Sequence, residues 1–232
     1  GLEHYLDLRA DEADAKAGIH GGTPRTIEGP LYVAGAPESV GFARMDDGSE
    51  AGKIPTLFIE GTVTDTEGKV IEGAKVEIWH ANSLGNYSFF DKSQSDFNLR
   101  RTILSDAKGQ YVAQTTMPVG YGCPPKGTTQ FVLDKLGRHG NRPSHVHYFI
   151  SAPGYRKLTT QFNIEGDKYL WDDFAFATRE GLVATAFDVT DPAESSRRGV
   201  DGPFKHITFN VELVKAKTTA PSTEVERRRA SA

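Results

Sequence analysis

Two histidines one residue apart carry the clearest chemical signal in this chain. His145 and His147 lie in the segment RPSHVHYFI, residues 142–150, whose valine, isoleucine and aromatic content favours a β-strand. Alternate residues of a strand point to the same face, so the two imidazoles can reach one point in space. Imidazole is a ligand for zinc, copper, iron and nickel. The spacing predicts a metal site, and the alternative is a pair of hydrogen-bonded histidines inside a β-sandwich.

Two tyrosines in separate loops strengthen the prediction of a metal site. Tyr87 ends the segment WHANSLGNY, residues 79–87, where a predicted strand runs into a turn. Tyr121 ends MPVGY, residues 117–121, a loop rich in proline and glycine. Either tyrosine alone would be interpreted as a packing residue. In this order with the histidine strand, the segments resemble the metal site of the intradiol ring-cleavage dioxygenases, which hold non-haem Fe(III) with two tyrosinates and two histidines.

The resemblance extends over most of the chain. Residues 24–33, PRTIEGPLYV, are similar to the segment that enters the catalytic domain of that family. Residues 61–65, GTVTD, and 76–82, VEIWHAN, are similar to its first core strands. Residues 171–175, WDDFA, are similar to a loop at its substrate pocket.

The resemblance implies a ligand set for one Fe(III) per chain. Tyr87 and His145 match the family's equatorial ligands, and Tyr121 and His147 match its axial ligands. A free tyrosine has a pKa of about 10, but a nearby cation favours the phenolate. Fe(III), two tyrosinates and one hydroxide carry no net charge together, and a neutral centre costs less to bury than a charged one. Tyr121 is expected to leave the metal and to take a proton from the substrate as a general base.

Further matching positions surround the expected ligands. Arg142, three residues before His145, is expected to stabilise negative charge on the bound ring. Gln161 matches a family residue that orients a ligand. The positions that match an apolar wall around a flat ring are Ile27, Pro30, Leu31, Phe174 and Ala175. Simple core packing explains Ile27 and Leu31 equally well.

The implied reaction is the intradiol cleavage of catechol by O2 to cis,cis-muconate, a step of aromatic compound degradation in which the ferric centre activates the substrate. No extra basic residue is evident for a ring carboxylate, which argues against protocatechuate. Enzymes that act on chlorocatechol or hydroxyquinol share the same ligands, so the motif leaves them open as alternatives.

Two functions outside this family stay open at the level of sequence. The predicted hairpin of residues 61–76 resembles one found in non-catalytic transthyretin-like sandwiches, although a binding module leaves Tyr121 and the histidine pair unexplained. A zinc hydrolase needs a third histidine or a carboxylate beside the pair. Metal analysis separates the three, because they require iron, no metal and zinc respectively.

The elements that position these residues are predicted to be short strands. Strand-like runs separated by turn signals span 56–64, 75–81, 109–117, 145–152, 158–164, 182–189 and 206–214. This pattern predicts a mainly β fold, an antiparallel β-sandwich catalytic domain with a helical N-terminal segment. The expected organisation is a helical segment at 1–22, an extended lead-in at 23–55, the catalytic sandwich at 56–214 and a polar tail at 215–232.

Composition limits the possible partners. The chain has 232 residues and a net charge of −4, which argues against a general nucleic-acid binder. No apolar run approaches the roughly 18–20 residues that span a membrane. The single cysteine, Cys123, excludes an intrachain disulfide and favours a cytoplasmic location. Cys123 is interpreted as a small loop residue rather than a nucleophile. No metal role is expected for His4, His20, His80, His139 or His206, and His80 is expected to be a hydrogen-bonded core residue.

The first residues resemble the end of a longer helical region. The segment GLEHYLDLR, residues 1–9, has a partial apolar stripe at helical spacing. In the resembled family such a region precedes the catalytic domain and contributes to a dimer. We therefore expect a homodimer for the full-length protein, and lower stability or a monomer without that region.

Overall fold

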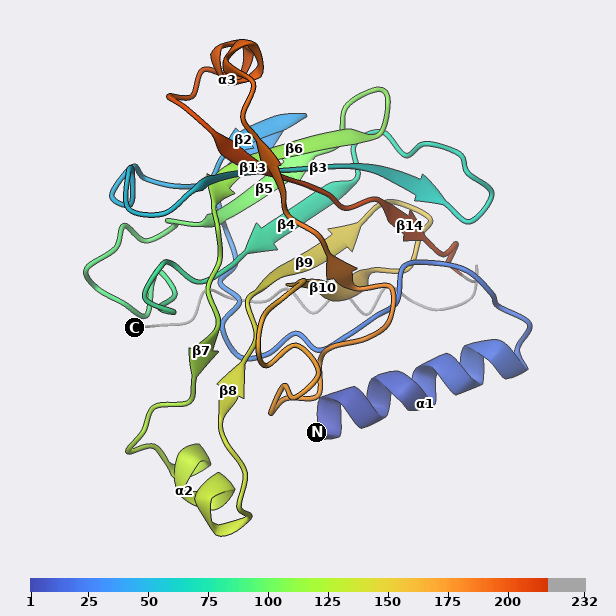
Figure 1. Cartoon of the computed structure of the whole chain (residues 1–232). Helices are drawn as coiled ribbons and strands as arrows, with labels where there is room; N and C mark the ends of the chain where they lie inside the picture. The colour runs from blue at the N-terminus through green and yellow to red at the C-terminus, as the bar shows by residue number, and fades with distance from the viewer. Residues whose placement is uncertain (217–232) are drawn as a thin grey trace.

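Two mixed sheets pack face to face to form the body of the protein. The computed structural model describes residues 1–216, so the predicted tail at 215–232 lies almost entirely outside the described residues. Figure 1 shows the two sheets as stacked layers, with helix α1 beside them and helix α2 on a separate arm. No helix in the described part is both long and apolar enough to cross a bilayer.

Sheet A contains, near the middle of the sheet, the strand that carries the two histidines. Its strands, in spatial order, are β1 (Glu38–Val40), β5 (Arg100–Leu104), β4 (Lys75–Trp79), β9 (His145–Ser151), β10 (Leu158–Ile164) and β11 (Val183–Ala184). Sheet B has the order β12 (Phe187–Val189), β13 (Phe204–Thr208), β3 (Thr56–Asp65), β6 (Gln110–Thr116) and β2 (Phe42–Arg44), and β14 (Val211–Leu213) also pairs with β3. The short strands β7 (Tyr121–Gly122) and β8 (Asn141–Arg142) pair outside both sheets.

The prediction of a mainly β sandwich is confirmed, and its purely antiparallel character is wrong, because several strand pairs are parallel. The central pairs β4·β9, β9·β10 and β3·β6 are antiparallel. The pairs β1·β5, β2·β6, β3·β13 and β10·β11 are parallel. No hairpin turn joins the two strands of any of these parallel pairs, so no turn fixes their direction. Strands β1 and β2 both come from the predicted extended lead-in and join opposite sheets.

Several elements differ from the predicted ranges. The run predicted at 182–189 is divided between β11 in sheet A and β12 in sheet B. The helices are α1 (Leu2–Lys16), α2 (Thr128–Lys135) and α3 (Pro192–Arg198), and the sequence reading did not include the last two. Helix α3 has the signals of a helix start, since Asp191 accepts a hydrogen bond from the Ala193 amide and proline occupies the first helical position. A seven-residue helix is too short for its periodicity to be evident.

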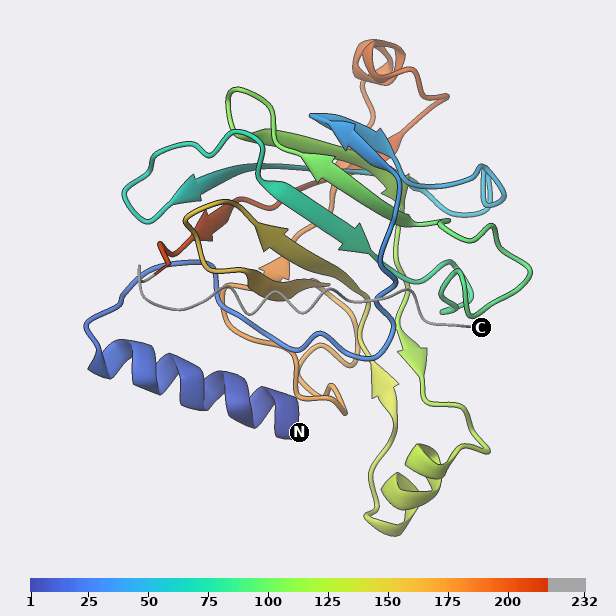
Figure 2. The ribbon, with the colours of Figure 1, turned by 180° about the vertical axis from the view of Figure 1, so that it is seen from behind.

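The alternation of side chains along β9 decides where the core and the site lie. Val146, Tyr148 and Ile150 point between the sheets and join the main apolar core. His145 and His147 therefore point to the other face of sheet A. Figures 1 and 2 show the lead-in (blue) and the loop after β10 (orange) running across that outer face. The cover is hydrogen-bonded to the sheet, since the Thr26 amide donates to the Thr159 carbonyl oxygen.

A substitution at Gly61 tests the packing of β3 against the chain that leaves β13. A Cβ atom at Gly61 would collide with the carbonyl oxygen of Phe209 and lie 2.8 Å from Cε1 of Tyr111. We expect Gly61→Ala to lower the free energy of unfolding by roughly 3 kcal/mol, the upper end of overpacking costs, as measured by denaturant unfolding. Gly127→Ala is the control, because Gly127 caps α2 with a negative φ of −81° and a Cβ atom there would come no closer than 3.1 Å to another residue, the Pro124 carbonyl oxygen. Equal effects of the two substitutions would contradict this packing.

His80 connects the two sheets and makes stability depend on pH. Its Nδ1 atom donates to the Ala81 carbonyl oxygen at 2.7 Å, and its Nε2 atom accepts from the Thr115 hydroxyl of β6 at 2.7 Å. Burial lowers the pKa of His80 to about 4. Between pH 4 and the usual pKa near 6.5 the unfolded chain binds more protons than the folded chain, so stability falls as the pH drops through this window.

We expect His80 to contribute roughly 3 kcal/mol of this loss. Urea unfolding from pH 7.5 to 4.5 should show a smaller loss of stability with falling pH in His80→Asn than in the parent chain. Because every other titrating group is the same in both proteins, parallel pH profiles would count against this role of His80.

Candidate metal centre

Four side chains from three separate parts of the chain converge on the outer face of sheet A. The Nε2 atoms of His145 and His147 are 3.1 Å apart, and the Tyr87 hydroxyl lies 3.5 Å from the Nε2 atom of His145. The ring of Tyr121 lies 5.5 Å from the rings of both Tyr87 and His145, measured between centroids. The structure therefore brings all four predicted ligands together, and we call this group the ligand cluster.

Strand β9 and its neighbours hold the two imidazoles. In the register of the sheet, His147 is opposite Trp79 of β4 and Gln161 of β10. The Trp79 and His147 rings stack in parallel, with centroids 5.0 Å apart and planes 5° apart. The Nδ1–H group of His145 donates to the Pro143 carbonyl oxygen at 2.6 Å, which directs its Nε2 lone pair into the cluster. The orientation of the His147 ring is thus fixed by Trp79 of β4, and that of the His145 ring by the backbone just before β9.

A tight turn after β4 presents Tyr87. The Asn82 side-chain oxygen accepts from the amides of Leu84 and Asn86 at 3.0 and 2.9 Å, a local pattern that asparagine favours. Gly85 in this turn has φ +78°, and a Cβ atom there would lie 2.7 Å from Cβ of Tyr121. The two tyrosine segments can therefore approach each other only because residue 85 is glycine.

Tyr121 is positioned by the base of the projecting arm. It pairs with Arg142 across the short strands β7 and β8, and helix α2 lies at the tip of the same arm. Tyr121 is half-buried, whereas Tyr87, His145 and His147 are each at most 4% exposed. The second tyrosine is thus the most accessible member of the ligand cluster.

The electrostatics of the pocket favour neutral ligands unless a cation is present. Burial, followed by the charge of Arg142, lowers the pKa of His145 well below its ordinary value. Burial, followed by His145, lowers the pKa of His147 in the same way. Burial, followed by Tyr121, raises the pKa of Tyr87 well above its ordinary value. Neutral imidazoles are competent metal ligands, and a bound cation would favour the phenolate.

The donor set fits a hard, Lewis-acidic metal ion. It offers two imidazole nitrogens and two phenol oxygens in a buried space, and Nδ1 of His147 is buried without a hydrogen-bond partner in the described residues. Among residues 1–216, no group of three or more His, Cys, Asp or Glu side chains is arranged to hold a metal. The zinc-hydrolase alternative therefore lacks its third ligand in this part of the chain.

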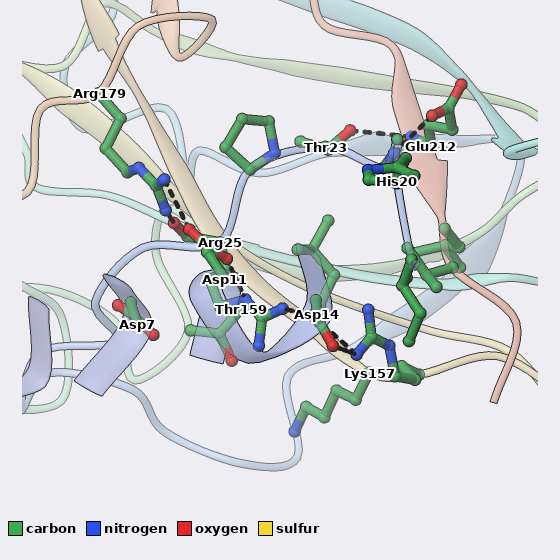
Figure 3. Close-up of a pocket in the computed structure, with 18 residues that line it drawn as sticks. Asp7, Asp11, Asp14, His20, Thr23, Arg25, Lys157, Thr159, Arg179 and Glu212 are labelled. Carbon is green, nitrogen blue, oxygen red and sulfur yellow. Dashed lines mark hydrogen bonds and ion pairs between the residues drawn. The ribbon is translucent and has the colours of Figure 1, made fainter. Parts of the chain in front are cut away.

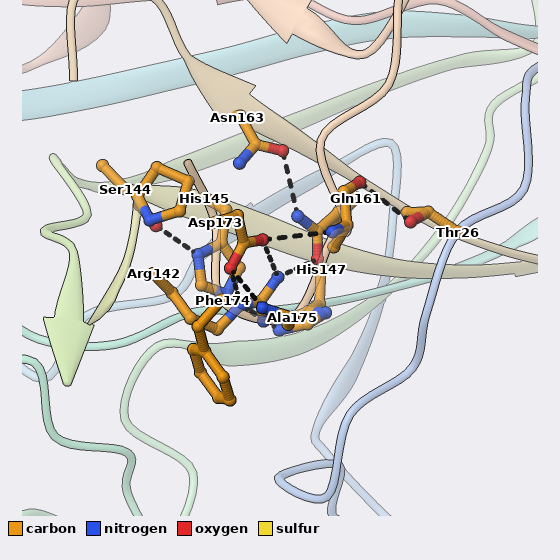
Figure 4. Close-up of polar contacts among 12 residues, drawn as sticks. Thr26, Arg142, Ser144, His145, His147, Gln161, Asn163, Asp173, Phe174 and Ala175 are labelled. Atoms are coloured by element: carbon orange, nitrogen blue, oxygen red, sulfur yellow. Dashed lines mark hydrogen bonds and ion pairs between the residues drawn. The ribbon is translucent and has the colours of Figure 1, made fainter. Parts of the chain in front are cut away.

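A buried polar network surrounds Arg142 (Figure 4). Its guanidinium lies 3.0 Å from Nε2 of His145, donates to Gln161 at 2.9 Å and donates twice to Asp173 at 3.2 Å. Gln161 in turn donates to Asn163 at 2.9 Å. Burial alone would lower the pKa of Arg142, but Tyr121 and Asp173 outweigh it and raise the pKa, so the guanidinium stays charged.

The predicted apolar wall is only partly assembled around the cluster. Leu31 packs against the buried group of Trp79, Tyr87 and Phe149. A Cβ atom at Gly29 would lie 3.8 Å from Cε1 of His147, which places the lead-in beside the imidazole. The other predicted wall residues differ in exposure: Ile27 is buried, Phe174 and Ala175 are half-buried, and Pro30 is exposed.

Arg100 helps to build the site, although the sequence analysis did not identify it. It is 1% exposed, and it donates to the carbonyl oxygens of Leu31 and Ser88 at 2.7 and 3.1 Å and to the Ser88 hydroxyl at 2.9 Å. Its guanidinium lies 5.6 Å from the centre of the Tyr87 ring. Burial lowers the pKa of Arg100 to about 10. Arg100 thereby joins the Tyr87 turn to the lead-in, and no sequence signal separated it from a surface strand arginine.

A cavity of about 520 Å³ lies away from the ligand cluster, between α1 and the start of β10 (Figure 3). Five of its charged side chains pair with one another: Asp11 with Arg25 and Arg179, and Asp14 with Arg25 and Arg156. These ion pairs attach α1 to the sandwich, because α1 has no buried residue of its own.

Comparison with known proteins agrees with the geometry. The family model described as "Dioxygenase" matches residues 27–213. A catechol 1,2-dioxygenase of Acinetobacter guillouiae is 77% identical over 95% of this chain and 72% of its own length. One of Acinetobacter baylyi is 56% identical over 99% of this chain and 74% of its own length. Proteins named chlorocatechol 1,2-dioxygenase are more distant, at 36% identity over 74% of this chain and 66% of theirs.

Comparison with solved structures also identifies catechol 1,2-dioxygenases as similar proteins. The crystal structure of wild-type Acinetobacter radioresistens catechol 1,2 dioxygenase is 86% identical, with a TM-score of 0.95, and covers 100% of this chain and 75% of that one. This chain belongs to the intradiol dioxygenase family. It is an oxidoreductase of the dioxygenase class.

Proposed function

We propose that this chain cleaves catechol between its two hydroxylated carbons with O2, giving cis,cis-muconate, the reaction of a catechol 1,2-dioxygenase. The observation that carries this proposal is the convergence of Tyr87, Tyr121, His145 and His147 in one pocket with the charged Arg142 beside them. The names of the relatives that are 56–86% identical support the same substrate. Only the distant relatives favour chlorocatechol or hydroxyquinol.

We assign one non-haem Fe(III) to the four ligands. When bound, a ferric ion would supply Lewis acidity that binds catechol as an anion and makes its ring reactive toward O2. Tyr87 is suited to remain a ligand, since the Asn82 turn and Arg100 fix its position. Tyr121 is suited to exchange, because it is half-buried on a two-residue strand. On release it can accept a proton from a catechol hydroxyl at its phenolate oxygen.

We assign Arg142 to stabilising negative charge on the substrate ring and Gln161 to orienting the Arg142 guanidinium. The Arg142 guanidinium is held within 3.0 Å of His145 and places a fixed positive charge beside the ligand cluster. A preorganised charge in a water-poor site stabilises negative charge as it develops on the ring. Gln161 fixes one edge of that guanidinium through its side-chain oxygen. Leu31 packs against the buried group that contains Tyr87, and we assign it to limiting the access of water, which would strengthen these interactions.

Two further predictions concern the whole protein. The single cysteine favours a cytoplasmic location, and this stays a prediction. A homodimer of the full-length protein also stays a prediction, and sedimentation analysis measures it directly.

Turnover of catechol tests the proposed function. Anaerobic addition of catechol should shift the visible absorption band of the iron-loaded protein, because the substrate would replace a ligand on the metal. Admission of air should then produce cis,cis-muconate with consumption of one O2 per catechol. A spectrum that does not respond to catechol, or a different ring-cleavage product, would refute the assignment.

Replacement of a nitrogen ligand tests the composition of the centre. We expect His147→Ala to reduce bound iron at least about tenfold and to remove the visible band. His206→Gln is the matched control, because His206 lies on β13 of sheet B, paired with Glu60. Metal content by mass spectrometry and absorption of the two purified variants give the result. Full iron occupancy in His147→Ala would show that the histidine pair is not the metal site.

A further inference from the structure

Asp173 is a buried carboxylate to which neither the sequence reading nor the proposed reaction gives a role. Its side chain is 1% exposed, and it lies directly before Phe174 and Ala175 in the loop after β10. A buried aspartate of this kind is rare unless its charge is paired. The question is therefore what its charge and its hydrogen bonds hold in place.

The two oxygens of Asp173 serve two structures at once. Oδ1 accepts from Nε of Arg142 at 3.2 Å and from the Ala175 amide at 3.0 Å. Oδ2 accepts from Nη2 of Arg142 at 3.2 Å and from the Ala177 amide at 3.3 Å. All four contacting groups are N–H donors, and an ionised aspartate can accept a hydrogen bond from each of them. Each oxygen accepts from one guanidinium nitrogen and one loop amide, so the carboxylate forms a bidentate ion pair with Arg142 and also holds the loop.

The loop so folded is also attached to the rest of the site. The Phe174 amide donates to the Asn141 carbonyl oxygen at 3.2 Å, next to Arg142 in β8. The Thr26 hydroxyl donates to the Ala177 carbonyl oxygen at 2.9 Å, which joins the lead-in to the same loop. Figure 4 shows Asp173 lying between Arg142 and this loop, with Thr26 on the far side. The carboxylate is therefore a shared anchor for the guanidinium, the loop and the lead-in.

We propose that Asp173 is a positioning residue that acts through Arg142, holding the guanidinium at the ligand cluster and the Phe174–Ala175 wall in one fixed arrangement. This inference rests on the proposed function of Arg142. An arginine side chain has many rotamers, and β8 is only two residues long, so the strand alone cannot fix the guanidinium. Asp173 removes that freedom and balances the buried positive charge.

Asparagine at this position keeps the shape of the side chain but removes its charge and one acceptor oxygen. Its amide nitrogen would face N–H donors of either Arg142 or the loop, because all four present contacts are donors. We expect Asp173→Asn to lower kcat by about 100-fold, with KM changed less than about threefold, because a displaced guanidinium loses its effect on developing charge. Iron content and the resting visible band should stay as in the parent chain.

Asp65 provides a matched control. Its side chain is 0% exposed, and it likewise accepts from two backbone amides, those of Glu67 and Lys69, in sheet B's turn region away from the ligand cluster. We expect Asp65→Asn to lower the melting temperature while kcat stays within about threefold of the parent value. A loss of kcat in Asp65→Asn equal to that in Asp173→Asn would reduce the role of Asp173 to general stability and overturn the proposal.

A double-mutant cycle gives the decisive readout. If Asp173 acts through Arg142, Asp173→Asn should lower kcat less than about threefold when Arg142→Gln is already present. A further loss near 100-fold in that background would mean that Asp173 acts independently, and the proposal would be wrong. Thermal unfolding of the same four proteins reports the pairing without any turnover. A parent chain that does not oxidise catechol refutes the proposed function, whereas additive unfolding effects refute the Asp173–Arg142 pairing itself.

Discussion

The two-residue alternation of β9 is the constraint on which the rest of the structure depends. Val146 and Tyr148 must enter the core between the sheets, and this requirement sends His145 and His147 to the opposite face of sheet A. A shift of one residue in register would put the imidazoles in the core and the valine in the site. The antiparallel neighbours β4 and β10 prevent such a shift, because both pair with β9 over most of its length. The same hydrophobic burial that stabilises the sandwich therefore directs both imidazoles toward the ligand cluster.

An outer sheet face that carries histidines has to be covered before it can work as a buried site. The cover comes from segments with little regular structure: the lead-in, the Tyr87 turn and the loop after β10. Because such segments have no ladder of their own, buried side chains satisfy their backbone groups. Arg100 performs this task between the turn and the lead-in, and Asp173 performs it in the loop. Charged residues are used where a surface loop would use water.

The charges at the site are arranged in pairs whose members come from different elements. Arg142 on β8 is balanced by Asp173 in the loop, so the pair adds little net charge to the pocket. The pKa of Tyr87 is raised by burial and by Tyr121, so the phenol becomes an anion only when a cation compensates it. The pKa values of His145 and His147 are lowered, so both imidazoles stay neutral and could bind the same cation. Without a cation the pocket therefore holds neutral imidazoles and a neutral Tyr87 phenol.

The sequence by itself determined the sandwich, the identity of the four converging side chains and the family. Local periodicity revealed the central strands, and the His-x-His spacing needs no tertiary information, since i and i+2 share a face in any strand. Tertiary structure alone decided the parallel edge strands and the roles of Arg100 and Asp173. Those features join segments far apart in the chain, and a charged residue gives no local sign of whether it will be solvated or buried against a distant carbonyl group. Burial and long-range pairing are properties of the folded chain, so they appear only when the segments meet.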